Sequence, residues 1–287
     1  MKSNIAYLNS ENEWQDVDIK IRARGKFRKK NCFFTPLKLK VSKDNAKKTV
    51  FKGSRKLKLV MPCKKSNSSD FVLKEYLAYK MYEQISEYHF KTRLLDIEYK
   101  DVKKKDDKLY KFKGFVIEDD EDLAERVGGK VFDKKKHPAN FDEVTVRNAL
   151  FQFMIGNTDY SVSYQHNMKM LFVDKKSVPI PYDFDLCGLV DSDYAIVSDS
   201  RKNPLPITKV TERYYLGYKR DLSVYDKIRN EYLEKKPEIL KVLDDHKTFF
   251  ENIESYNKAK QFMLDFFKIL ESDSLFKKEI IDRAKTI

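Results

Sequence analysis

The sequence predicts an α+β fold, in which an antiparallel sheet carrying one helix is followed by a mainly helical part. Apolar and polar residues alternate over much of residues 1–120, and one long helical pattern interrupts them. Amphipathic helical patterns dominate residues 121–287. We therefore expect two lobes, residues 1–120 and 121–287, that together form one domain.

Three strand-like segments open the first lobe. They are VDIKIRARG from residue 17, PLKLKV from residue 36 and KLKLV from residue 56. Each would place aliphatic side chains on one face of a sheet and charged side chains on the other. The connection GKFRKKNCFFT, between the first two, is rich in basic and aromatic residues.

A helix and two further strands complete the first lobe. The segment SSDFVLKEYLAYKMYEQISEY, from residue 68, has apolar residues at helical spacing and a Ser or Asp at its start. The strand-like runs TRLLDIEY and YKFKGFVIED follow, separated by the polar turn KDVKKKDDK. The predicted order is three strands, a helix and two strands.

The second lobe begins at the acidic segment EDDEDLAERVGG, where a short helix should end at two glycines. DEVTVRNALFQFMIGN predicts an amphipathic helix ended by Gly156, and MKMLFV with VPIPYDFD predicts a hairpin around DKKS. Helices are expected from about residue 222 to 285. Their core-facing stripe comprises Phe262, Met263, Phe266, Phe267 and Leu270.

Composition excludes several classes of protein. With 41% hydrophobic residues, 13% aromatic residues, 8 Gly and 8 Pro, the chain is not of the disordered class. No apolar run approaches the roughly 18 residues of a membrane-spanning helix, so we expect no membrane span. The N-terminus lacks the apolar stretch of a secretory signal. This favours a cytoplasmic setting but leaves an exported or envelope setting open, since a signal could have been removed.

The net charge of +13 is compatible with nucleic acid, a membrane surface or an anionic substrate such as a nucleotide as partner. Most of the cations are Lys, spread through runs such as those at 103–105 and 134–136. This spread favours a solvated surface over one nucleic-acid-binding stripe.

The three cysteines, Cys32, Cys63 and Cys187, lie far apart and form no C-x-x-C pair. The spacing argues against a zinc knuckle and against a disulfide framework. It favours a reducing compartment.

Several residues have the types that phosphoryl transfer requires. That chemistry needs a cation on the phosphates, carboxylate and amide oxygens for Mg²⁺, and a carboxylate that orients or deprotonates the attacking oxygen. Such residues occur in this order: Lys58, Glu75, Glu118, Asp159, Asn167, Asp183 and Asp185.

Four segments in this order resemble the spore-coat protein H (CotH) kinase family, an atypical bacterial group with a reduced protein-kinase-like fold. They are IRARGKFRKKN with PLKLKV, FVLKEYLAYKMYEQI, GNTDYSVSYQHNMKML and PIPYDFDLCGL, and they cover roughly residues 15–200. They are more similar still to related bacterial proteins with RGNFR, KLKLV, IGNTDWS and PYDFD motifs. The resemblance implies a two-lobed kinase-like fold that uses ATP with Mg²⁺ or Mn²⁺.

The resemblance also implies roles for residues of the second lobe. Asp159 corresponds to the catalytic-loop Asp, a base or orienter of the acceptor hydroxyl, and Asn167 to its metal-binding companion. Asp183 and Asp185 stand where these kinases place a metal-binding carboxylate, and Asp183 is the stronger candidate. The alternative is that Asp159 and Asp183 only satisfy backbone groups in turns.

The nucleotide would be bound by residues of the first lobe and its helix. Arg24 and Gly25 lie in the loop after the first predicted strand, and Glu118 at the lobe boundary. For the phosphate lysine, Lys58 fits by topology, whereas Lys40 or Lys38 fits by the family pattern. Glu75 would pair with that lysine, although surface roles for Lys58 and Glu75 stay open.

The sequence departs from conventional kinases in three ways. The spacing from Asp159 to Asn167 is longer, NTD replaces His-Arg-Asp, and the first loop has one glycine. Side-chain charge from Arg24, Lys26 and Arg28 could compensate for the missing glycines.

Three functions follow from these observations. The leading expectation is an ATP-dependent phosphotransferase acting on a protein or other hydroxyl-bearing acceptor, with nucleotidyl transfer by the same residues left open. The second is a catalytically inactive kinase-like scaffold or nucleotide-binding module, suggested by the glycine-poor loop. The third is a nucleic-acid-binding protein, which we do not favour because the sequence contains no motif of that class.

Overall fold

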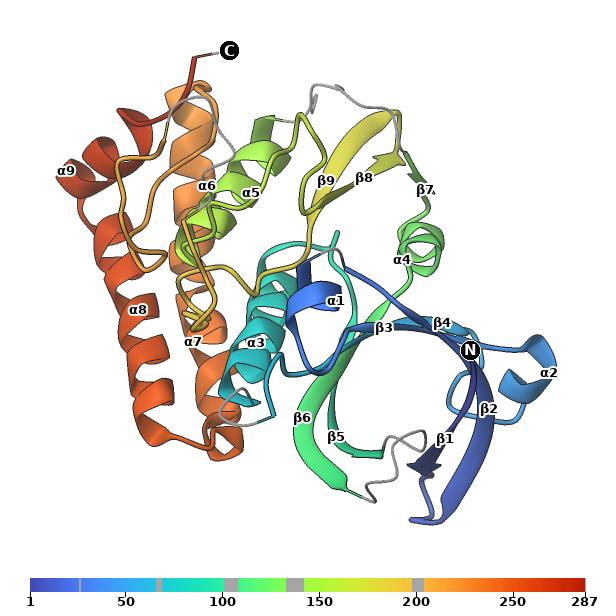
Figure 1. Ribbon diagram of the computed structural model, residues 1–287. Helices are drawn as coiled ribbons and strands as arrows, with labels where there is room; N and C mark the ends of the chain where they lie inside the picture. Colours follow the sequence, from blue (N-terminus) through green and yellow to red (C-terminus); the bar gives the residue numbers. More distant parts are fainter. Residues whose placement is uncertain (26, 66–68, 101–107, 133–141, 198–203, 287) are drawn as a thin grey trace. The chain divides into compact units, whose positions relative to one another are not determined.

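The computed structural model describes residues 1–25, 27–65, 69–100, 108–132, 142–197 and 204–286. The chain divides into two compact units (Figure 1): unit 1 is Met1–Val72 with Lys91–Leu123, and unit 2 is Leu73–Phe90 with Ala124–Ile287. Lys26, the basic runs at 103–105 and 134–136 and most of the predicted turn at 100–108 lie outside the described residues.

Unit 1 contains a six-stranded antiparallel sheet with strand order β1-β2-β3-β4-β6-β5 (Figure 1). Its strands are β1 (Lys2–Leu8), β2 (Trp14–Ala23), β3 (Leu37–Val41), β4 (Lys56–Val60), β5 (Thr92–Lys100) and β6 (Leu109–Glu118). The five predicted strands are confirmed, and so is the α+β class. Strand β1 was not predicted.

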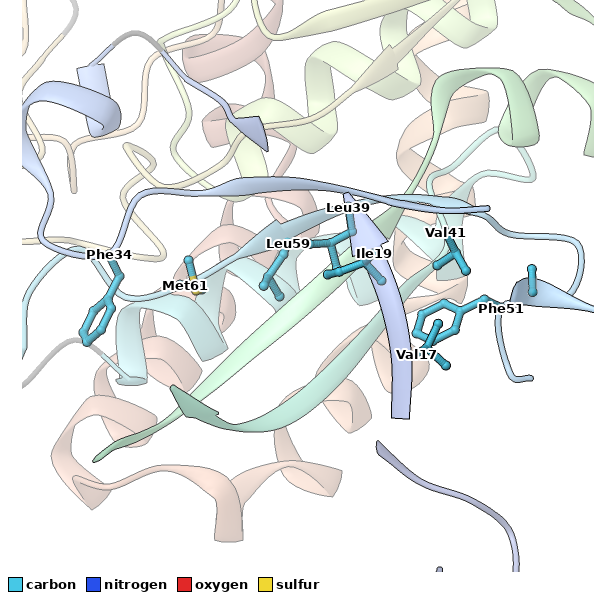
Figure 2. Packing of buried hydrophobic residues seen from close by; sticks show 9 residues of the cluster. Val17, Ile19, Phe34, Leu39, Val41, Phe51, Leu59 and Met61 are labelled. Atoms are coloured by element: carbon cyan, nitrogen blue, oxygen red, sulfur yellow. The ribbon is translucent and has the colours of Figure 1, made fainter. Parts of the chain in front are cut away.

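Alternation in β2, β3 and β4 gives the sheet one apolar face. Val17 and Ile19 of β2, Leu39 and Val41 of β3 and Leu59 of β4 are all buried in one cluster, as Figure 2 shows. Burying a side chain of this size contributes about 1.5–3 kcal/mol. The apolar face therefore fixes the register of these strands.

The sheet curls around this core. Partly buried residues of β1, such as Ile5, and of β5 and β6, such as Tyr99 and Phe112, pack against the same cluster. Phe34 contacts Tyr99, Tyr110 and Phe112, with ring centroids 4.6–5.4 Å apart. Strands from opposite ends of the strand order thus bury their side chains in one core, which a flat sheet would not allow.

Two short helices lie in the connections between strands of unit 1. Helix α1 (Phe27–Asn31) follows β2, and helix α2 (Lys43–Ala46) follows β3. The hydroxyl of Ser42 accepts a hydrogen bond from the Asn45 N–H (3.1 Å) and caps α2. Neither helix was predicted.

The prediction that the cysteines form no disulfide is wrong. Cys32, at the end of α1, forms a disulfide with Cys63, just beyond β4. The N–H of Phe33 also donates to the carbonyl of Cys63 (2.8 Å), so the two segments run side by side. Sequence spacing could not show this, because the contact depends on the pairing of β3 with β4. Cys187 is free and buried.

Unit 2 is mainly helical, with a three-stranded antiparallel sheet of order β7-β8-β9. Helices α3 (Ser69–Ile85) and α4 (Asp120–Arg126) each begin in unit 1 and end in unit 2. The remaining elements are β7 (Lys130–Val131), α5 (Asp142–Met154), β8 (Met168–Val173), β9 (Lys176–Pro181), α6 (Leu222–Glu234), α7 (Lys236–Asp245), η1 (Lys247–Phe249), α8 (Ile253–Glu271), α9 (Asp273–Phe276) and η2 (Lys277–Ile281).

The core of unit 2 forms between α5, α6 and α8. Most of the predicted stripe on α8 is confirmed: Met263, Phe266, Phe267 and Leu270 are fully buried, whereas Phe262 is half-buried. Phe266 contacts Phe153 of α5 at a centroid distance of 6.2 Å. Polar contacts join α5 to α6: Arg147 pairs with Glu231 (2.7 Å), and the hydroxyl of Tyr232 donates to the carbonyl of Arg147 (2.8 Å).

The predicted hairpin of unit 2 is confirmed. Strands β8 and β9 pair from Val173 opposite Lys176 to Met168 opposite Pro181. The two turn residues, Asp174 and Lys175, have φ of 47° and 62°. Two left-handed residues are typical of a type I′ turn, whose twist matches that of the strands.

No described helix is both long enough and apolar enough to span a membrane, in agreement with the sequence prediction.

Thiol titration tests the disulfide. Burial raises the pKa of the Cys187 thiol to about 12, so native, unreduced protein should not react with an alkylating reagent. After unfolding we expect the one free thiol, Cys187, to react, and after reduction all three cysteines. Three reactive thiols in unfolded, unreduced protein would contradict the pairing.

The disulfide should also stabilise the fold. The double variant Cys32→Ser/Cys63→Ser is expected to lose about 3–4 kcal/mol of unfolding free energy, as for a loop of this length. Denaturant unfolding with and without reductant provides the control, because reductant should shift the midpoint of the wild type and leave that of the double variant unchanged.

Candidate functional site

The segment before Asp159 is fixed by the end of helix α5. Gly156, with φ of 65°, takes the left-handed conformation that ends many helices. The side-chain amide of Asn157 donates to Gln152 Oε1 (2.8 Å), and its Oδ1 accepts the N–H of Asp159 (2.9 Å). Asn157 therefore joins the helix to the loop and sets the direction in which Asp159 leaves it.

Both carboxylate oxygens of Asp159 have polar partners. Oδ1 lies 3.1 Å from His166 Nε2, and Oδ2 accepts from Asn167 Nδ2 (3.0 Å). The same nitrogen donates to the backbone carbonyl of Asp159 (2.7 Å). Because both partners of this nitrogen are acceptors, its identity as the amide nitrogen follows from the chemistry. The amide oxygen of Asn167 is then directed away from Asp159.

A short loop returns the chain from Asp159 to Asn167. The backbones of Ser161 and His166 exchange two hydrogen bonds, of 3.0 and 2.9 Å, which close the loop. Tyr164 lies in this loop and is 76% exposed. Asn167 has φ of 51°, and its carbonyl accepts the N–H of Tyr182 (3.1 Å). The β8–β9 pairing thus extends to the residue next to Asp183.

Phe184 anchors the DFD segment in the core of unit 2. Its ring is fully buried and contacts Tyr79 of α3 at 4.6 Å and Phe151 of α5 at 5.4 Å between centroids. The backbone N–H of Asp183 donates to the hydroxyl of Tyr79 (2.9 Å). Asp183 itself has φ of 67°, an uncommon conformation for a residue with a side chain.

The two acids of the DFD segment have different surroundings. Asp185 is buried, and its Oδ2 accepts from the hydroxyl of Tyr194 (3.2 Å). Asp183 is half-buried, and no residue in the described part of the chain forms a hydrogen bond or ion pair with its carboxylate. Asp183 is therefore the acid of this pair whose oxygens are open to a ligand.

Two glycines bring the loops before Asp159 and after the DFD segment together. The N–H of Gly188 donates to the carbonyl of Gly156 (3.1 Å), and the N–H of Leu189 to that of Ile155 (2.9 Å). A Cβ on Gly188 would lie 2.4 Å from the carbonyl oxygen of Val210. A side chain at position 188 would therefore collide with the backbone at Val210.

Glu75 lies near the same region of unit 2. It is buried on α3, one turn before Tyr79. Burial is the main cause that raises the pKa of the Cys187 thiol, and the Glu75 carboxylate adds to it, so Glu75 is close to the segment that follows DFD. Direct contacts thus join Asp159 to Asn167 and Asp183 to Tyr79 of α3, the helix that also carries Glu75.

Some of the oxygen atoms in this region are suitable ligands for a hard cation. Among the described residues, no three His, Cys, Asp or Glu side chains form a group that could hold a metal ion. Asp183 offers carboxylate oxygens, and Asn167 offers an amide oxygen. Such a set suits Mg²⁺, which keeps several waters and uses one or two protein ligands together with substrate phosphates.

The predicted residues of unit 1 centre on Lys58. This side chain is 10% exposed and forms an ion pair with Asp120 at the start of α4. Burial lowers the pKa of Lys58, the Asp120 carboxylate opposes that shift, and the nearby Arg24 guanidinium adds to it. Arg24 is thus close enough to Lys58 to influence its pKa, and a role for the two in phosphate binding stays a prediction.

Two other lysines of the sheet differ in their contacts. Lys38, directly opposite Lys58, forms an ion pair with the buried Asp119 (2.8 Å). Lys40 is exposed and lies opposite Lys56. Of the lysines that the sequence suggested for the phosphate, Lys58 is thus the one that is buried and close to Arg24.

The loop after β2 contains Gly25, the glycine predicted to lie next to the nucleotide. Gly25 has φ of 78°, so a glycine is favoured at this turn. Arg28, suggested as a source of charge for this loop, is buried and donates to the carbonyl of Met61 (2.7 Å).

The Glu118 side chain connects two strands of the sheet. Its Oε1 accepts the N–H of Lys91 (2.7 Å), which ties the end of β6 to the start of β5. The residue opposite it in the sheet is Leu57, so its side chain lies on the face away from Lys58. These contacts give no support to a direct role in nucleotide binding.

Sequence reasoning missed two residues that position the candidate site, Tyr79 and Asn157. Tyr79 lies in the segment predicted as a helix, and its spacing of one turn from Glu75 places both on one side of α3. Asn157 belongs to the quoted GNTD motif, and an Asn two residues before an Asp is typical of an Asx turn. His166, the sequence neighbour of Asn167, also contacts Asp159.

Comparisons with known proteins were negative: neither a protein-family profile, nor a curated protein, nor a solved structure matches the chain. The resemblance to CotH-type kinases therefore rests on the sequence motifs alone.

The variant Tyr79→Phe tests how Asp183 is held. It keeps the ring contact with Phe184 but removes the acceptor of the Asp183 N–H, so we expect a loss of about 1–2 kcal/mol in unfolding free energy. Hydrogen exchange at the Asp183 amide should become faster. Tyr164→Phe is the matched control, because its hydroxyl is exposed. An Asp183 amide equally protected in both variants would contradict this arrangement.

Proposed function

We propose that the chain is a nucleotide-dependent phosphotransferase with a two-lobed, protein-kinase-like arrangement of CotH type. In it, unit 1 contributes the cations for the phosphates, and unit 2 contributes the carboxylates and the amide. The acceptor is a protein or another molecule with a hydroxyl group. The nucleotide is ATP, used with Mg²⁺ or Mn²⁺.

One observation carries the proposal: the Asn167 amide joins Asp159 to the hairpin that ends at Asp183. Asn167 donates to Asp159 through its side chain and accepts from Tyr182 through its backbone. Asp159, Asn167 and Asp183, which span 24 positions, are thus linked. Asn167 contacts Asp159 directly, and it contacts Tyr182, the residue before Asp183. A turn that only satisfied its own backbone would not need the DFD segment beside it.

The chemistry assigns different roles to the two acids. Asp159, held by Asn167 and His166, has a fixed carboxylate that can orient an acceptor hydroxyl or accept its proton. Asp183 and the amide oxygen of Asn167 would hold the metal ion. The metal, when bound, would neutralise charge on the transferred phosphoryl group. Asp185, whose carboxylate accepts a hydrogen bond from the Tyr194 hydroxyl, would stabilise the DFD segment.

In unit 1, the proposal assigns the phosphates to Lys58 and Arg24. The partly desolvated Lys58 would interact strongly with an anion, although Asp120 already occupies one side of it. Gly25 provides the turn that lets the backbone approach. Glu75 is proposed as the partner of the phosphate lysine, as in the kinase resemblance.

A specific observation favours the inactive scaffold as the second candidate. Both oxygens of Asp159 are already engaged, and a single glycine serves the first loop. A scaffold would retain the fold and these contacts without binding a metal–nucleotide complex. Nucleotide binding therefore decides between the two functions.

Calorimetric titration of ATP with Mg²⁺, and then with chelator, is the primary experiment. We expect metal-dependent binding that Asp183→Asn weakens by more than about tenfold, because Asn tolerates the left-handed conformation but lacks the charge. Asp191→Asn is the matched control, since Asp191 is exposed and also has a positive φ, of 47°. Equal binding by both variants, or no binding by the wild type, would exclude the phosphotransferase.

A second titration tests which of the candidate lysines binds the phosphates. Lys58→Met is expected to weaken ATP binding by about 10- to 100-fold through the loss of a charged hydrogen bond, and Lys40→Met by much less. The reverse order would move the phosphate site to the β3 lysine. Intact-mass measurement after incubation with ATP would distinguish phosphoryl from nucleotidyl transfer to the protein itself.

A further inference from the structure

Cations gather on the face of the unit 1 sheet that is opposite to the apolar core. In β1 to β4 they alternate with the buried or partly buried residues of the strands. We call this group the basic face, and it consists of Lys2, Lys20, Arg22, Lys38, Lys40, Lys56 and Lys58.

The register aligns these cations in two rows across the strands. One row is Lys2, Lys20, Lys40 and Lys56, and the other is Arg22, Lys38 and Lys58. Residues opposite each other in an antiparallel pair have Cα atoms about 5 Å apart. Every neighbouring pair within each row therefore opposes like charges, an arrangement that destabilises a sheet.

Carboxylates of the chain neutralise the inner part of the basic face. Asp119 lies 2.8 Å from Lys38 Nζ and 3.8 Å from Lys56 Nζ, and Asp120 pairs with Lys58. Both acids belong to the acidic segment EDDED, residues 118–122. The structure thus shows how consecutive acidic residues of a polypeptide engage this ladder of lysines.

The outer part of the basic face lacks such a segment. Lys2, Lys20, Arg22 and Lys40 are exposed, and none of them has an ion pair with a carboxylate among the described residues. The acids on the same face of β2, Asp16 and Asp18, are separated from Lys20 by two or four positions along the strand. Four cations on three adjacent strands are therefore available to a partner.

We infer that the outer part of the basic face binds an acidic polypeptide segment of a partner protein. The same ladder geometry that receives Asp119 and Asp120 continues outward from Lys56 to Lys40, Lys20 and Lys2. An acidic segment there would turn opposed like charges into charge pairs. This inference uses no nucleotide chemistry, so it stands or falls separately from the proposed function.

The same face is poorly suited to single-stranded nucleic acid. Such binding combines basic residues with aromatic side chains on which bases stack. The exposed aromatic residue on this face of β2 is Trp14, six positions from Lys20, and Asp16 and Asp18 lie between them. At about 3.3 Å per residue it is roughly 20 Å away, and the intervening carboxylates would repel phosphate.

Fluorescence anisotropy with a labelled peptide of consecutive Asp and Glu residues tests the inference. The wild type should bind it, with an affinity that falls as salt is raised. Lys20→Gln and Arg22→Gln should each weaken binding by about two- to fivefold, the range for one exposed charge pair. Lys52→Gln is the control, because Lys52 is an exposed lysine of unit 1 outside the basic face.

Thermal unfolding provides a second test, because removal of a cation should stabilise the free protein but reduce its stabilisation by the peptide. Without peptide, Lys20→Gln should raise the unfolding midpoint, because it removes the repulsion from Lys2 and Lys40. With saturating peptide, the midpoint should rise more in the wild type than in that variant.

Two results would overturn the inference. One is equal peptide affinity in the wild type, Lys20→Gln and Arg22→Gln. The other is tighter binding of a single-stranded oligonucleotide than of the peptide at physiological salt. Because all variants keep the core of unit 1, a folded protein is expected in every arm.

Discussion

The antiparallel register of strands β8 and β9 is the constraint on which the candidate site depends. Their two-residue turn, at Asp174 and Lys175, sets Val173 opposite Lys176, and the pairing then reaches Asn167 and Tyr182. A slip of one residue would move every side chain of a strand to the other face. The amide of Asn167 would then turn away from Asp159. A turn of two residues thus determines which polar groups meet about six residues away along each strand.

The same hairpin keeps residues in conformations that a free chain would avoid. Asn167 and Asp183 are both left-handed, a conformation that Asn and Asp adopt at a lower cost than other residues with side chains. The Asn167 bonds to Asp159, the Tyr79 bond to Asp183 and the burial of Phe184 offset that cost. These contacts hold both residues of the candidate site in their observed conformations.

Local periodicity predicted most elements of the fold, because alternation in segments such as VDIKIRA and PLKLKV directly reflects one buried face. Local periodicity could not predict which distant segments of the chain pair with one another. Nothing in the sequence indicates that β6 lies between β4 and β5, that Cys32 meets Cys63, or that Arg28 is buried against Met61. For the site, residue types and order identified Asp159, Asn167 and Asp183. Their supports, Tyr79 and Asn157, were missed because each contact depends on the tertiary fold rather than on a local pattern.

The two faces of the unit 1 sheet are not independent of one another. Burial of Val17, Ile19, Leu39 and Leu59 fixes the register, and this register then decides which charged residues oppose each other on the other face. The repulsion within the basic rows can therefore be relieved only by changing residues or by adding anions, since shifting a strand would expose the core. Asp119 and Asp120 supply anions to the inner part, and acids in this position also favour the N-terminus of α4. One acidic segment thus stabilises the start of a helix and three of the seven cations of the basic face. The other four are held in place by the packing of the core, without carboxylates that compensate their repulsion.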